Sequence, residues 1–147
     1  MVMTYKTIVV AVDGSKEAEW AFKKAIEIAK RNDASIVLTH IIDVRALAAV
    51  EMHDRAVIER SEQYAKELLE NYQKQAAEAG VKEVSVEIEF GSPKVKIAKD
   101  IAPKHHADLI VCGATGLNAV ERLLIGSVSE HITRYAKCDV LVVRTEK

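Results

Sequence analysis

Cysteine, net charge and long apolar runs are all scarce in this sequence of 147 residues. Its two cysteines, Cys112 and Cys138, form no C-x-x-C pair and sit in or beside apolar strand-like runs, so we expect buried free thiols, with a disulfide as the alternative. The formal net charge of −1 gives no electrostatic footprint for nucleic acid or an anionic membrane. No apolar run approaches the ~20 residues of a membrane helix. Because residues 1–6 do not resemble a signal peptide, we expect a cytoplasmic protein.

The motifs of several enzyme classes are also missing. The sequence has no H-E-x-x-H, no G-x-S-x-G and no Walker lysine, and the missing lysine argues against a fast P-loop NTPase. A dinucleotide-binding oxidoreductase is expected to carry G-x-G-x-x-G in the first β–α turn, where this sequence has only Asp13-Gly14. A phosphoacceptor module would need more acidic residues around Asp13. The five histidines have neither metal-ligand nor triad spacing, so we expect loop or surface roles for them: His40, His53, His105, His106 and His131.

Strand-like and helix-like patterns alternate along the chain. Apolar runs predict buried strands at residues 7–12, 35–42, 108–112 and 139–144, and strict alternation predicts an edge strand at 84–90. Apolar residues at helical spacing predict a helix after each of the first four strands. The first two helices are at 18–29 and at 51–79, the second capped by Gly80. The third begins at Ser92-Pro93 and stops or kinks at Pro103, and the fourth begins at Ser127, with Val128, Ile132, Tyr135 and Ala136 facing inward. This order predicts a single-domain α/β fold over residues 1–147, a doubly wound five-stranded parallel sheet with helices on both faces.

A glycine-rich stretch follows the fourth predicted strand. Gly113, Gly116 and Gly126-Ser127 form the pattern G-x2-G-x9-G-S, and a helix is predicted to begin at its end. Glycine lets the backbone approach a bulky anion, and a helix N-terminus presents unpaired N–H groups and a positive dipole end. The stretch therefore predicts a phosphate site, with ordinary turn glycines as the alternative. Residues 127–130 also read S-x-x-E, which predicts a capping box that accounts for Ser127 without a ligand, and Ser129 lies close by.

Further candidate residues come from the other strand ends. In doubly wound sheets, ligands bind beyond the C-terminal strand ends where the strand order reverses, and both Asp13 and Gly113 lie at that end. Asp13 could accept hydrogen bonds from ribose or adenine, or cap the following helix. Ile41 could offer backbone groups and an apolar face to a base, or be a core residue. Arg122 could neutralise a phosphate, or lie on the surface.

Five segments together resemble the universal stress protein family: VVAVDGS, LTHIID, ADLIVCGATG, RLLIGSVSEHI and CDVLVV. The resemblance covers essentially the whole chain, and G-x2-G-x9-G-S is the ATP-binding signature of that family. It implies the strand order 3-2-1-4-5 and a homodimer through the last strand, residues 139–144. It also implies a bound ATP with a divalent metal, Mg²⁺ or Mn²⁺, on the phosphates.

By this resemblance, Asp13 and Ile41 would hold the adenosine, with Ile41 acting through its backbone. The phosphates would be held by the glycine signature and the start of the following helix: Gly113, Gly116, Gly126, Ser127, Val128 and Ser129. Apart from the resemblance, we add Thr115 and Arg122 to the expected nucleotide-binding residues. We therefore expect an ATP-binding regulatory or stress-response protein in which the dimer surface or a mobile segment, 43–56, responds to nucleotide. Because no general base is evident, hydrolysis should be slow or need a partner. The alternative is an ATP-using enzyme of phosphoryl or nucleotidyl transfer.

Overall fold

The computed structural model describes residues 3–43, 55–115 and 125–145, so most of the segment 43–56 lies outside the described residues. The elements are β1 (Thr7–Ala11), α1 (Lys16–Asn32), β2 (Ser35–Asp43), α3 (Arg55–Glu78), β3 (Val84–Gly91), α4 (Pro93–Lys96), the π-helical η1 (Ile97–Ile101), α5 (Ala102–Lys104), β4 (Leu109–Gly113), α6 (Ser127–Tyr135) and β5 (Asp139–Val143). The strands form one parallel sheet in the order β3-β2-β1-β4-β5. The predicted fold class and strand order are confirmed.

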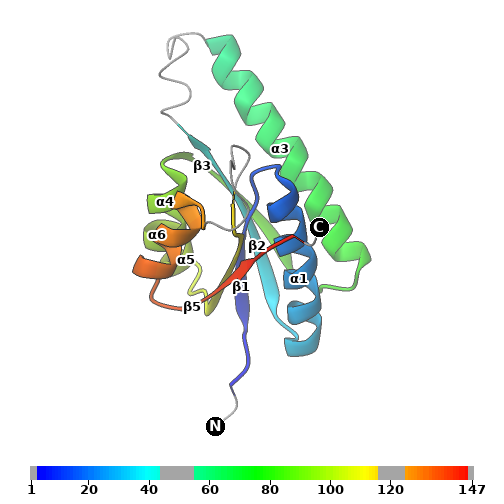
Figure 1. Ribbon diagram of the computed structural model, residues 1–147. Coiled ribbons are helices and arrows are strands. Elements are labelled where there is room, and N and C mark those ends of the chain that lie inside the picture. Colours follow the sequence, from blue (N-terminus) through cyan, green and yellow to red (C-terminus); the bar gives the residue numbers. More distant parts are fainter. Residues whose placement is uncertain (1–2, 44–54, 116–124, 146–147) are drawn as a thin grey trace.

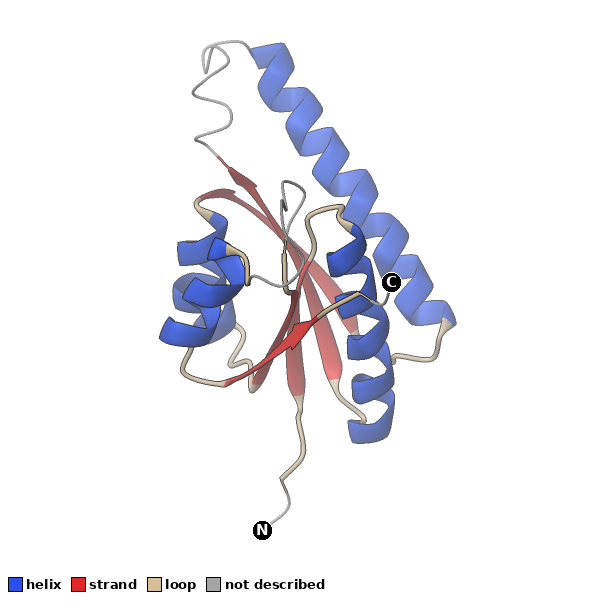
Figure 2. Ribbon diagram, viewed as in Figure 1, coloured by secondary structure: helices blue, strands red, loops and turns tan. Residues whose placement is uncertain are grey.

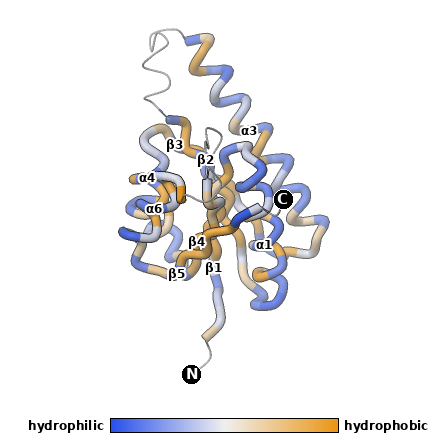
Figure 3. The backbone as a smooth tube through the Cα atoms, in the orientation of Figure 1, coloured by the Kyte–Doolittle hydropathy of each residue, from blue (hydrophilic) through white to orange (hydrophobic). Residues whose placement is uncertain are grey.

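Two helical layers cover the sheet, with α1 and α3 on one face and α4, α5 and α6 on the other (Figures 1 and 2). Alternate residues of β1 serve the two layers: Ile8 and Val10 pack toward α1 and α3, and Val9 packs toward α4 and α6. Figure 3 shows the hydrophobic residues concentrated along the strands β1, β4 and β5. Because these strands are covered on both faces, their sequences read as continuous apolar runs rather than as alternating ones.

Local capping sets the ends of the two long helices. The N–H of Ala18 donates to the hydroxyl of Ser15 at 3.1 Å, which makes Ser15 the N-cap of α1. At the C-terminal end of α3, Gly80 follows the helix with a φ of +103°, as predicted. The N–H of Val81 donates to the carbonyl of Ala76 at 3.1 Å across this glycine, the pattern of a Schellman motif.

The helical stretch 93–104 contains a π turn. It begins at Ser92 as N-cap, as predicted, although the Ser92 side chain makes no capping hydrogen bond. Within it the N–H of Ala102 donates to the carbonyl of Ile97, five residues back. Pro103 follows immediately and lacks an N–H, so the usual hydrogen-bond ladder cannot continue through it. The helix ends one residue after Pro103, close to the predicted stop.

A charged cluster ties the edge strand β3 to the end of α5. Oε1 of Glu87 lies 2.5 Å from Nε2 of His105, and Oε2 accepts from Nζ of Lys104 at 3.1 Å. The Glu87 side chain is 11% exposed. Burial, the largest influence, raises the pKa of Glu87, but the hydrogen bonds and charges of His105 and Lys104 together outweigh it and lower the pKa. The folded protein therefore favours the carboxylate at this position.

Glu87→Gln tests this cluster through the pH dependence of unfolding. A lowered folded pKa contributes stability that is present above the unfolded value of about 4.3 and is lost as the pH falls through the folded value. We expect wild type to exceed Glu87→Gln in free energy of unfolding near about pH 6, with the difference shrinking below about pH 4 in urea titrations. Glu89→Gln on the same strand is the control, because its side chain bonds no other described residue. A difference that stays equally large near about pH 3 would contradict this assignment.

Candidate functional site

The C-terminal ends of β1 and β4 lie side by side in the sheet. Their register pairs Val10 with Val111, so Asp13 and Ala114 leave the sheet at the same edge. From this pair of strands the order runs one way to β2 and β3 and the other way to β5. The edge is therefore the point of strand-order reversal, where open α/β sheets bind ligands. This arrangement confirms that Asp13 and the strand ending at Gly113 lie at the same edge of the sheet.

Asp13 holds the start of α1 with one of its two carboxylate oxygens. Oδ1 accepts from the N–H of Ser15 at 2.9 Å and from its hydroxyl at 2.5 Å. The local capping role, one of the two predicted for Asp13, is therefore observed. The other oxygen, Oδ2, makes no hydrogen bond to a described residue. It leaves an acceptor at the sheet edge that a ligand hydroxyl or amine could use.

The N-terminus of α6 presents three backbone donors. Gly126 is the N-cap, and the first helical hydrogen bond runs from the N–H of Glu130 to the carbonyl of Gly126 at 2.9 Å. The N–H groups of Ser127, Val128 and Ser129 precede that bond and have no acceptor among the described residues. They point along a helix dipole whose positive end lies at this terminus. An anion bound here would meet three donors at once.

The predicted capping box at 127–130 is wrong by one residue. Gly126 has the extended backbone of an N-cap, with φ of −68° and ψ of 161°, and Ser127 is already the first helical residue. The helix has no side-chain cap, and the Glu130 carboxylate accepts instead from Nη2 of Arg134 at 3.0 Å. The S-x-x-E pattern misplaced the cap by one residue because Ser127 directly follows the true N-cap, Gly126. Its hydroxyl is therefore not required for capping.

A buried serine closes the connection between β4 and α6. The hydroxyl of Ser129, a residue only 2% exposed, donates to the carbonyl of Ala114 at 2.8 Å and lies 3.1 Å from that of Gly126. The N–H of Gly126 donates to the same Ala114 oxygen at 2.7 Å. The N–H of Ala114 donates to the carbonyl of Val143 on β5 at 2.8 Å. We call this set of bonds the Ala114 clasp; it fixes the start of α6 beside the end of β4.

Gly113 is required by packing against α1. A Cβ atom built at Gly113 would lie 2.6 Å from Cβ of Glu17 and 2.8 Å from the Glu17 carbonyl carbon, far inside contact distance. The Glu17 carboxylate in turn accepts from the N–H and hydroxyl of Thr145 at 3.0 and 2.7 Å. The absence of a side chain at Gly113 thus brings β4, α1 and the residues after β5 together. Its predicted phosphate role stays a prediction.

Ile41 lies at the end of β2, where the strand runs on past β1. Its side chain is 7% exposed and packs in the core cluster on the α4 side, as the core alternative predicted. Hydrogen bonding between β1 and β2 ends where the N–H of Val12 donates to the carbonyl of Thr39 at 2.9 Å. Strand geometry repeats every two residues, so the backbone groups of Ile41 face the same way as those of Thr39, beyond the end of β1. They therefore face the same edge of the sheet as Asp13.

Of the other predicted site residues, Thr115 is described and Gly116 and Arg122 are not. Thr115 is half-buried and directly follows Ala114 of the clasp. Gly116 and Arg122 lie outside the described residues, so their roles stay predictions.

His40 and Tyr64 support the Asp13 loop and were not predicted to do so. Nδ1 of His40 donates to the carbonyl of Val12 at 2.7 Å, and its ring meets the Tyr64 ring edge-on at 6.2 Å between centroids. Gly14 has a φ of +86°, and a Cβ built there would lie 2.5 Å from the Tyr64 hydroxyl oxygen. The signal for this contact is absent from local sequence, because Tyr64 comes from α3 and approaches only once the layers have packed.

The described residues contain neither a metal-binding cluster nor a membrane span. No group of three or more His, Cys, Asp or Glu residues in the described ranges is placed to hold a metal ion. Within the same ranges, no helix is both long enough and apolar enough to cross a bilayer. Both cysteines are free, as predicted. Cys112 is buried, and burial raises its pKa to about 12, whereas Cys138 is only half-buried, contrary to expectation.

Ser129→Ala tests the Ala114 clasp. Removing the buried hydroxyl takes away one of the two donors of the Ala114 carbonyl and one of the two of the Gly126 carbonyl, so we expect a loss of about 1–2 kcal/mol in the free energy of unfolding. The matched control is Thr133→Ala, because the exposed Thr133 hydroxyl donates to the carbonyl of Glu130 at 2.8 Å in the same helix. We expect that control to change stability by less than about 0.5 kcal/mol. Equal losses of unfolding free energy in the two variants, measured by urea unfolding, would show that the Ser129 hydroxyl stabilises the fold no more than an exposed helix hydroxyl does.

Solved structures with the same fold include proteins that hold adenine nucleotides. The chain matches the universal stress protein UspA from Lactobacillus plantarum with a TM-score of 0.83 and 31% identity, over 97% of this chain and 100% of that one. It matches a universal stress protein in complex with cAMP with a TM-score of 0.75 and 28% identity, over 98% and 100%. It also matches the universal stress protein from Archaeoglobus fulgidus in complex with dAMP, with a TM-score of 0.69 and 26% identity, over 97% and 100%.

Sequence relatives agree with the structural ones. A protein of Staphylococcus haemolyticus that carries the name universal stress protein is 54% identical over 145 residues, which cover 99% of this chain and 88% of the relative. One from Staphylococcus aureus strain USA300 is 54% identical over 99% and 87%. The sequence model of the universal stress protein family matches residues 4–144. This chain belongs to the universal stress protein family.

Proposed function

We propose that this protein binds ATP in the crevice beyond β1 and β4 and acts as a nucleotide-dependent regulatory or stress-response protein. The observation that carries the proposal is the start of α6, where three neighbouring N–H groups have no acceptor among the described residues and the Ala114 clasp holds them beside the end of β4. The similar structures in complex with cAMP and dAMP support an adenine nucleotide. The choice of ATP rests on the G-x2-G-x9-G-S signature.

Each part of the nucleotide has a partner of suitable chemistry at this edge. The phosphates would accept from the N–H groups at 127–129, with Gly116 and Arg122 completing the predicted set. Oδ2 of Asp13 would accept from ribose hydroxyls, and the backbone of Ile41 would meet the adenine. The described residues hold no group of three or more His, Cys, Asp or Glu placed for a metal, and we propose that the Mg²⁺ or Mn²⁺ ion would be bound mainly by phosphate oxygens and water.

We propose that ATP hydrolysis is slow or requires a partner. The Asp13 carboxylate holds Ser15 with one oxygen, and the Glu17 carboxylate holds Thr145 with both. A general base must be free to take a proton from water; both oxygens of Glu17 already accept from Thr145, and Oδ2 of Asp13, the oxygen left over, would be taken by the ribose hydroxyls. The crevice therefore suits retention of a nucleotide better than its rapid turnover.

We also propose a homodimer through β5. This strand is one edge of the sheet, and its residues Val140, Leu141 and Val142 are only half-buried in the single chain. An exposed apolar edge strand favours pairing with another strand, and a twin copy offers a self-complementary surface. A cytoplasmic location stays part of the same proposal.

Ser127→Pro separates the backbone donor from the side chain at the phosphate site. Proline is favoured at the first helical position, and the φ of −68° and ψ of 161° at Gly126 suit a residue before proline, so the helix should persist. We expect Ser127→Pro to weaken binding of ATP with Mg²⁺ by roughly tenfold, the value of one charge-assisted hydrogen bond. Ser127→Ala removes only the hydroxyl and should weaken binding less.

Isothermal titration calorimetry measures the affinity of wild type and both variants for ATP with Mg²⁺, and circular dichroism checks that each variant is folded. Ser127→Pro with the same affinity as wild type would overturn a phosphate site at the start of α6. Failure of wild type to bind ATP with either Mg²⁺ or Mn²⁺ would overturn the nucleotide proposal itself.

A further inference from the structure

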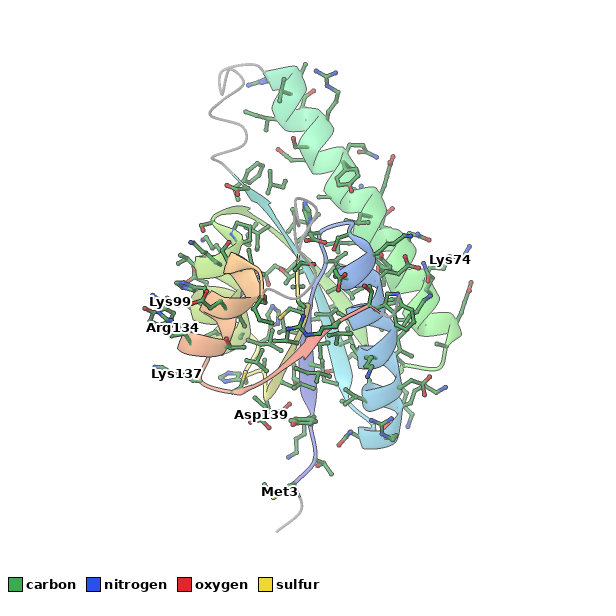
Figure 4. The ribbon with its side chains drawn as sticks, viewed as in Figure 1. Met3, Lys74, Lys99, Arg134, Lys137 and Asp139 are labelled. Carbon is green, nitrogen blue, oxygen red and sulfur yellow. The ribbon has the colours of Figure 1, made fainter. Side chains whose placement is uncertain are left out.

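A basic and aromatic surface lies on the outer side of α4, η1 and α6. Its residues, which we call the α4–α6 basic patch, are Lys94, Val95, Lys99, Arg134, Tyr135 and Lys137. Figure 4 shows Lys99, Arg134 and Lys137 on the same side of the molecule. Two apolar side chains stand exposed within it, with Val95 38% and Tyr135 46% accessible. Nothing in the nucleotide proposal uses these side chains.

Aromatic contacts hold Tyr135 at the surface. Nζ of Lys99 lies 4.6 Å from the centre of the Tyr135 ring, a cation–π distance, and the His131 ring lies 4.4 Å from the same ring. The prediction that Tyr135 faces inward was therefore wrong. Ile132, fully buried, fills the core beneath α6 instead. Tyr135 thus stays 46% accessible even with Lys99 and His131 against its ring.

The positive charge of the patch is only partly neutralised. Arg134 pairs with Glu130 at 3.0 Å, but Lys94, Lys99 and Lys137 have no carboxylate partner among the described residues. Burial, together with the charges of Lys99, Lys94 and Arg134, lowers the pKa of His131. Nε2 of His131 is shielded from solvent there and has no hydrogen-bond partner within the described chain. Because Lys99 and His131 both lie against the Tyr135 ring, this nitrogen, unpartnered within the described residues, belongs to the same basic surface.

We propose that the α4–α6 basic patch binds an acidic segment of another polypeptide that carries an apolar side chain. The unpaired lysines would attract its carboxylates, and Tyr135 with Val95 would cover its apolar side chain. The whole chain has a net charge of −1, so the attraction is local to this surface. Glu130 and Asp100 stand among the cations and repel a continuous row of phosphates, whereas a peptide can place its carboxylates between them. A peptide therefore suits the patch better than nucleic acid or an anionic membrane.

The test uses the full-length protein and a short fluorescein-labelled peptide of glutamates interspersed with leucines. Fluorescence anisotropy at low salt measures binding, and a peptide with glutamine in place of every glutamate is the matched probe. We expect the double variant Lys94→Gln with Lys99→Gln to bind the glutamate peptide roughly tenfold more weakly than wild type. The control variant is Lys74→Gln on α3, on the opposite side of the molecule (Figure 4), and it should bind like wild type.

Three results would overturn the proposal. Equal binding of the glutamine peptide would show that carboxylates are not recognised. Equal weakening by Lys74→Gln would show that the attraction is not local to the patch. Tighter binding of phosphatidylglycerol vesicles or duplex DNA than of the peptide, at equal anion concentration, would assign the patch to a different class of partner. ATP binding plays no part in this experiment, so its outcome is independent of the proposed function.

Discussion

The carbonyl oxygen of Ala114 accepts the hydrogen bonds on which the site geometry depends. It receives the N–H of Gly126 and the hydroxyl of Ser129, while the N–H of the same residue reaches Val143 on β5. One residue thus joins the end of β4, the start of α6 and the neighbouring strand. Because parallel strands end together at one edge of the sheet, this clasp also fixes where the first turn of α6 stands relative to β1. Three unpaired N–H groups are held there.

Residues at this edge divide their atoms between folding and ligand chemistry. Asp13 uses Oδ1 to hold α1 and leaves Oδ2 without a described partner. Ser129 donates its hydroxyl to the clasp and leaves its N–H unpaired, and Ile41 buries its side chain while its backbone extends past β1. The structural roles of these residues therefore leave other atoms available for the proposed ligand roles, so the two interpretations, which the sequence presents as alternatives, are compatible. Substituting the whole side chain confuses the two roles, which is why backbone-directed variants separate them better.

The fold could be predicted because burial on two faces leaves a strong pattern. Four strands are covered on both sides and read as apolar runs, and the edge strand β3 reads as an alternating one. Strand order came from the resemblance rather than from the pattern. Helix ends marked by glycine or by Pro93 were also predictable, since those residues restrict or free the backbone at a single position.

What could not be predicted depends on contacts between distant elements. Gly113 must lack a side chain because Glu17 of α1 approaches it, and Tyr135 lies at the surface in contact with Lys99 of η1. The capping box failed for a local reason, since S-x-x-E spacing does not say which residue has the extended backbone. The support of Gly14 by Tyr64 likewise appears only when α3 packs onto its layer.

Amide chemical shifts report directly on the donors that the nucleotide would use. In ¹H–¹⁵N correlation spectra of the protein titrated with ATP and Mg²⁺, the largest shifts should fall on the amides of Ser127, Val128 and Ser129, with those of Asp13 and Ile41 also moving. The amide of Gly80, at the far end of α3, should stay in place. Saturable ATP binding that leaves the three α6 amides unshifted would contradict the proposal that the start of this helix holds the phosphates.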